Sequence, residues 1–84
     1  MIKRGQLYHV DWEMIGLERD TQGRTSAVII PAGSTLQIVK FPCPEDIRLA
    51  SVDWDGRSVK VFGPDLVHRA RHVLKSQVDC VGRG

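Results

Sequence analysis

The dipeptide Asp55-Gly56 stands between two short runs in which apolar and polar residues alternate. The runs cover residues 49–54 and 59–62, and a period of two is typical of strands with one buried face. Asp-Gly between such runs is the strongest short-range signal for a tight β-hairpin, because both residues tolerate the left-handed backbone that a two-residue turn requires. The sequence therefore predicts a hairpin here and a fold that is built on strands.

Two earlier segments also predict strands. Residues 6–12 alternate, and Tyr8, Val10 and Trp12 share one apolar face, which favours a place in the core for all three. Residues 25–30 form a nearly continuous apolar run, which favours a strand that is buried on both faces.

The segment 36–41 alternates once more and should form a hairpin with residues 25–30, because the turn-forming residues 31–34 lie between them. Pro42 should end this strand, since proline cannot donate to the ladder. Residues 14–24 interrupt the alternation with glycines and charged side chains, so we expect a long charged loop there.

The stretch that follows Gly63 fits two interpretations. Pro64 and Asp65 suit the start of a helix. The apolar residues beyond them fall on one side of a helical wheel: Leu66, Val67, Ala70, Val73 and Leu74. We favour a short helix, and a strand is the alternative for residues 64–77.

Together these elements predict a mostly β fold with one short helix. We expect a small SH3-like barrel of about five strands, closed by a short C-terminal helix. A chain of 84 residues has room for one domain, which we place at residues 1–77, with a flexible tail at residues 78–84. A domain of this size has a small core, and oligomerisation is one common remedy.

Composition indicates a protein of the cytoplasm. No apolar run approaches the roughly 18 residues of a membrane helix, and the basic start is not followed by the apolar region of a secretory signal. Two cysteines, Cys43 and Cys80, are fewer than a small secreted domain usually carries. We expect free thiols in a reducing compartment, with a single disulfide as the alternative.

Charge is spread unevenly along the chain. The formal net charge is +2 overall, but residues 1–55 carry −2 and residues 56–84 carry +4. A basic C-terminal part can be an ordinary solvated face or a contact for a polyanion. The solvated face is slightly favoured.

Few residues offer metal or nucleophilic chemistry. His68 and His72 are four residues apart, so a helix would present both on one face, a spacing that suits zinc. No further ligand is near them, and we predict no metal site. Cys43 is followed by Glu45 and Asp46, which would oppose the formation of a reactive thiolate. We therefore predict no catalytic cysteine.

Contacts with nucleic acid are a further possibility in the sequence. Aromatic rings of Tyr8, Trp12 and Trp54 would stack on bases, although a core position is favoured for Tyr8 and Trp12. Candidate phosphate ligands are the basic residues Arg19, Arg24, Arg57, His68, Arg69, Arg71 and Lys75.

The N-terminal segment resembles a known family of small β-barrel proteins. The features that carry the resemblance are Lys3-Arg4-Gly5, Tyr8, Val10-Asp11, Gly16, Glu18, Gly23 and the apolar run at residues 27–30. In order and spacing they are similar to the MazF/PemK (Kid) toxin family of endoribonucleases. Residues 38–42 are similar to that family's strand ending in proline, and residues 62–68 more faintly to its closing strand. The latter likeness favours a strand over the helix there.

The resemblance implies an activity and a site. Members of the family cleave single-stranded RNA without a metal or cofactor, because the 2′-hydroxyl of the RNA is the nucleophile. The family's catalytic arginine position falls on Thr25, with Arg24 one residue earlier. Its catalytic threonine would stand where this chain has Pro44. Arg24 and Thr25 are therefore the candidate catalytic residues, and the departure at Pro44 favours a degenerate site.

Two functions follow as hypotheses. The first is a toxin-like protein that binds or cleaves single-stranded RNA as a homodimer and has an antitoxin-like protein partner. The alternative is a non-catalytic SH3-like module that binds a protein or a nucleic acid. Neither hypothesis involves a membrane.

Overall fold

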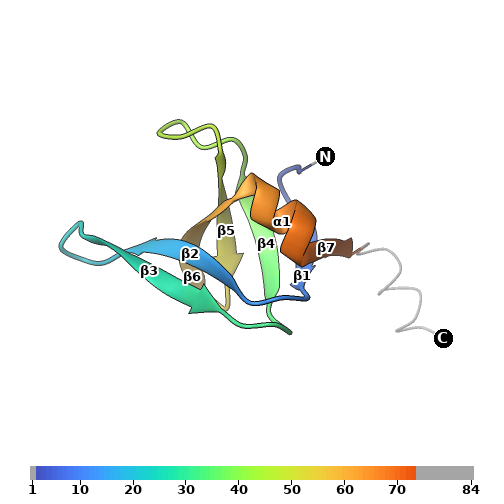
Figure 1. Ribbon diagram of the computed structural model, residues 1–84. Helices are drawn as coiled ribbons and strands as arrows, with labels where there is room; N and C mark the ends of the chain where they lie inside the picture. The colour runs from blue at the N-terminus through green and yellow to red at the C-terminus, as the bar shows by residue number, and fades with distance from the viewer. Residues whose placement is uncertain (1, 74–84) are drawn as a thin grey trace.

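A computed structural model describes residues 2–73 of the chain. Its elements are β1 (Leu7–Val10), β2 (Met14–Arg19), β3 (Thr25–Ile30), β4 (Thr35–Lys40), β5 (Leu49–Trp54), β6 (Arg57–Phe62), α1 (Gly63–Arg69) and β7 (Ala70–Val73). The strands form one antiparallel, strongly bent sheet in the order β3-β2-β6-β5-β4-β1-β7 (Figure 1). The predicted class, a small mostly β barrel with one short helix, is confirmed. It has seven strands instead of about five.

The predicted Asp-Gly hairpin is confirmed. β5 and β6 pair along their whole length, from Leu49 opposite Phe62 to Trp54 opposite Arg57. Asp55 and Gly56 both have positive φ, 55° and 81°, as a two-residue turn of this twist requires.

The sheet wraps around a single apolar core. Its fully buried side chains come from every part of the sheet and from the helix, and include Val10, Ile30, Leu36, Val59 and Leu66. β4 pairs with β1 at its start and with β5 at its end, and the register of β4 against β5 shifts between Ile38 and Lys40. Such a shift increases the local bend, which lets the sheet close over the core.

The expected loop at residues 14–24 is wrong, because residues 14–19 form β2. Met14 and Gly16 face the core while Ile15 and Leu17 face outward, so the alternation is present but short. β2 pairs with β3 from Met14 opposite Ile30 onward. Only residues 20–24 form the turn.

Two expectations about residues 25–30 are also wrong. β3 pairs only with β2 and is largely exposed, so it is an edge strand and is not buried on both faces. β3 forms no hairpin with β4, because the residues that connect these two strands form hydrogen bonds with β1 instead. Gly33 donates its amide to the Val10 carbonyl at 2.7 Å, and Val10 donates its own to the Ser34 carbonyl at 2.8 Å.

The predicted helix is real but shorter than its apolar pattern suggests. α1 starts beside Pro64 with Asp65 in the first turn and buries Leu66, but Val67 is exposed. The chain becomes extended at Ala70, and β7 pairs with β1 from Val10 opposite Ala70 to Leu7 opposite Val73. Pairing with β1 therefore determines that residues 70–73 form a strand and do not continue the helix. Leu74, Lys75, Cys80 and the expected tail at 78–84 lie outside the described residues.

Candidate functional site

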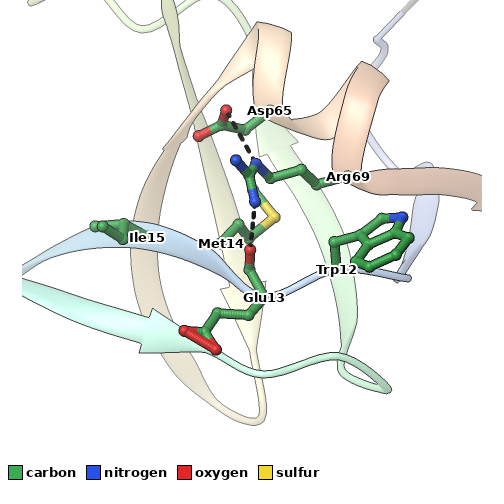
Figure 2. A pocket seen from close by; sticks show the side chains of 6 residues that line it. All are labelled: Trp12, Glu13, Met14, Ile15, Asp65 and Arg69. Carbon is green, nitrogen blue, oxygen red and sulfur yellow. Dashed lines mark hydrogen bonds and ion pairs between the residues drawn. The ribbon is translucent and has the colours of Figure 1, made fainter.

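One hollow lies between α1 and the segment that joins β1 to β2. It has a volume of about 420 Å³ and is lined by Trp12, Glu13, Met14, Ile15, Asp65 and Arg69 (Figure 2). We call it the Trp12 hollow. Trp12 is 67% exposed, so its predicted place in the core is wrong. The chain leaves β1 after Val10, and the alternation that buries Tyr8 and Val10 does not continue to Trp12.

Arg69 links α1 to residues 11–13, the two segments that form this hollow. Its backbone carbonyl accepts hydrogen bonds from the amides of Asp11 and Trp12, at 2.8 and 3.0 Å. Its guanidinium donates to the Glu13 carbonyl at 3.1 Å and lies 4.0 Å from the Asp65 carboxylate (Figure 2). The last residue of α1 therefore fixes the backbone course of residues 11–13.

The charges around Trp12 are more acidic than basic. Glu13 and Asp65 contribute two carboxylates, and Arg69 supplies the one cation that lines the hollow. Just outside it, Asp11 is 3.3 Å from the guanidinium of Arg71 and 3.8 Å from His9. The phosphate contacts predicted for Arg69 and Arg71 thus compete with carboxylates of the same chain.

A second hollow, of about 380 Å³, lies at the other end of β2. It is lined by Leu17, Arg19, Thr25, Glu45, Leu49, Ser58 and Lys60, and we call it the Arg19 hollow. Lys60 donates to the Glu45 carboxylate at 3.1 Å. The pKa of Glu45 lies below its ordinary value because of a backbone hydrogen bond and this lysine, and Arg19 adds to the effect.

The two predicted catalytic residues lie near the Arg19 hollow. Arg24 is in the turn between β2 and β3, where its amide and that of Gln22 both donate to the Asp20 carboxylate at 2.9 Å. No hydrogen bond or ion pair of the Arg24 side chain exists among residues 2–73. Thr25 begins β3 and lines the hollow.

The other predicted ligands are dispersed. His68 is on α1 and His72 is on β7, so they do not share a helical face. In Figure 1 the turn between β2 and β3, which carries Arg24, lies at the left, whereas α1 and β7 lie at the right. Arg57 is bound within the fold: it forms a two-bond pair with the Glu18 carboxylate, at 2.7 and 2.9 Å, and lies 4.8 Å from the Trp54 ring.

Three other observations bear on chemistry. Cys43 is a buried free thiol whose pKa is raised by burial. Among residues 2–73, no three His, Cys, Asp or Glu side chains come close enough to hold a metal ion. Over the same residues, no helix has the length and apolar character to cross a membrane.

The sequence interpretation missed most of the Trp12 hollow. Glu13, Met14, Ile15 and Asp65 were not singled out as a group, because they come from two segments about 50 residues apart in the sequence. One local signal was present: Trp12 stands between Asp11 and Glu13, two carboxylates that favour solvent over a core.

No protein-family model, no curated protein and no solved structure matches this chain.

Proposed function

We propose that this chain is a non-catalytic binding module that holds an extended segment of another protein in the Trp12 hollow. The observation that carries the proposal is Trp12 itself, a large ring that is 67% exposed and whose backbone amide is held by the Arg69 carbonyl. Exposed tryptophans beside a hollow are typical anchors of binding energy at protein interfaces. Ile15, which is 56% exposed, supplies further apolar surface in the same hollow.

The charges favour a protein segment with a basic residue beside an apolar one. The carboxylates of Glu13 and Asp65 outnumber the single cation Arg69 in the hollow, so an incoming lysine or arginine is attracted and a phosphate is repelled. Bases would stack on Trp12 equally well, but the backbone of RNA would bring negative charge toward these carboxylates. The cytoplasm is the compartment we propose, on the cysteine content and on the lack of an apolar segment in the sequence.

The test is selection from a random peptide library on the purified protein, followed by affinity measurement on variants. Trp12→Ala should weaken the selected peptides by about thirtyfold or more, since truncating an anchor typically costs 2 kcal/mol or more. Ile47 is 75% exposed and does not line the hollow, so Ile47→Ala is the matched control and should bind as the wild type does. Equal binding by Trp12→Ala would contradict the proposal.

A second candidate function is supported by the Arg19 hollow. Arg19, Lys60, Thr25 and Ser58 provide two cations and two hydroxyls there, and Arg24 is in the adjacent turn. This set would suit the phosphates of single-stranded RNA. It also includes the residues that the resemblance to MazF/PemK toxins implies for RNA binding or cleavage. Glu45 opposes this function, because its carboxylate already forms an ion pair with Lys60.

RNA binding and cleavage are tested together by gel electrophoresis of a long single-stranded RNA with the protein and without added metal. If the second candidate is right, the wild type retards or cleaves the RNA and Arg24→Ala does neither. Arg48→Ala is the control, since Arg48 is exposed, pairs with Asp46 and does not line this hollow. RNA that migrates unchanged with the wild type rejects this candidate and leaves the peptide proposal intact.

A further inference from the structure

The free edge of β3 is the least protected part of the sheet. β3 has a neighbour on one side only, and four of its six residues are exposed. Proteins usually protect such an edge with charged residues, proline or a bulge. Residues 25–30, Thr-Ser-Ala-Val-Ile-Ile, contain no charge and no proline, whereas β7 at the other end of the sheet carries Arg71 and His72.

The backbone groups on this edge follow from the pairing with β2. The amide of Asp20 donates to the carbonyl of Arg24 at 2.8 Å, and hydrogen-bonded pairs alternate in an antiparallel ladder. The residues of β3 that bond to β2 are therefore Ser26, Val28 and Ile30. Thr25, Ala27 and Ile29 direct their amides and carbonyls toward the free edge.

We propose that β3 pairs antiparallel with β3 of a second copy, about a two-fold axis at Ala27. In this register Ala27 lies opposite Ala27 of the second copy, and Thr25 lies opposite Ile29 of the second copy. All the outward backbone groups of both strands are then hydrogen-bonded, and the two sheets become one. The small side chain of Ala27 allows the strands to meet at the axis.

Side chains also fit this register. Ile15 and Ile29 are opposite each other on the outer face of β2 and β3, 56% and 60% exposed, and the second copy's strand covers the flank of Ile29. No like charges meet along the paired strands.

The inference does not depend on the ligand of the Trp12 hollow. One strand pair is a small interface, so the dimer should be reversible and dependent on concentration. Sedimentation equilibrium of the full chain at rising concentration should show a shift from monomer to dimer mass. A wild type that stays monomeric throughout would overturn the proposal.

Charge variants at position 27 test the register. Ala27 is exposed, so Ala27→Lys and Ala27→Glu should each fold, as thermal unfolding would verify, but each places like charges on the axis and should be monomeric. An equimolar mixture of the two should recover the dimer. Val67→Lys, a 66% exposed site on α1, is the control for added charge and should dimerise like the wild type. Dimeric Ala27→Lys, a monomeric mixture, or a monomeric control would each overturn the two-fold pairing.

Discussion

Several residues that the sequence predicts as phosphate ligands instead form contacts with other residues of the same fold. Arg57 pairs with Glu18 and lies over Trp54, and Arg69 joins α1 to the segment before β2. Gly16, Glu18 and Gly23, which contribute to the resemblance to MazF/PemK toxins, each have a structural role as well. Gly23 has a φ of 82° in the β2–β3 turn. Residue identity alone could not separate these two kinds of role.

Acid should weaken the pair between Glu18 and Arg57. The hydrogen bond from Arg57 lowers the pKa of Glu18 below its ordinary value of 4.5. Its contribution to stability is therefore fully present above that value and is lost as the pH falls through the lower pKa of the folded state. We predict that the thermal midpoint of Glu18→Gln varies less than that of the wild type between neutral pH and pH below 4.5.

Calorimetry across this pH range checks the prediction. Glu13→Gln is the control, since the Glu13 carboxylate has no ion-pair partner among residues 2–73, and its profile should follow the wild type. An equally steep acid loss in Glu18→Gln would show that other carboxylates account for the slope.

At the scale of elements, the sequence predicted what depends on local chemistry. The β5–β6 hairpin was predictable because Asp55-Gly56 determines its turn. The strands at β1 and β4 were predictable from alternation. β2 was missed because its glycine and charged residues mask the alternation, although it pairs with β3 along its whole length. β7 was only the alternative to a helix, because its pairing partner β1 is distant in sequence. Residues 66–74 satisfy a helical pattern, and only pairing with β1 ends the helix at Arg69.

The packing around β2, where it pairs with β6, leaves no room for a side chain at residue 16. A Cβ on Gly16 would overlap Cγ1 of Val59 and come within 3.1 Å of Cδ1 of Ile30, and both of these side chains are fully buried. We predict that Gly16→Ala lowers the free energy of unfolding by about 1–3 kcal/mol, as overpacking of a core typically does.

Urea denaturation measures this loss. Ser26→Ala, an exposed position on the adjoining strand β3, should change the free energy by less than about 0.5 kcal/mol. If Gly16→Ala were as stable as Ser26→Ala, the close approach of β2 and β6 would not constrain this position.

At the scale of the whole molecule, β2 connects two surfaces of different character. Its first residues, Met14 and Ile15, line the Trp12 hollow, and its later residues, Leu17 and Arg19, line the Arg19 hollow. The Trp12 hollow is lined by an aromatic ring and by acidic residues, whereas the Arg19 hollow is lined mainly by basic residues and hydroxyl groups. The sequence predicted part of the second, through Arg19 and Thr25. It could not predict the first, because that hollow exists only when α1 is packed beside the start of β2.

The most direct measurement of where a ligand binds is an NMR titration of the labelled protein with a selected peptide, following the backbone amides. Binding in the Trp12 hollow predicts chemical-shift changes in two separate segments, residues 12–15 and residues 65–69, and none of comparable size at Arg19, Arg24 or Lys60. Changes centred on those three basic residues, with Trp12 unaffected, would contradict it and would place binding at the Arg19 hollow.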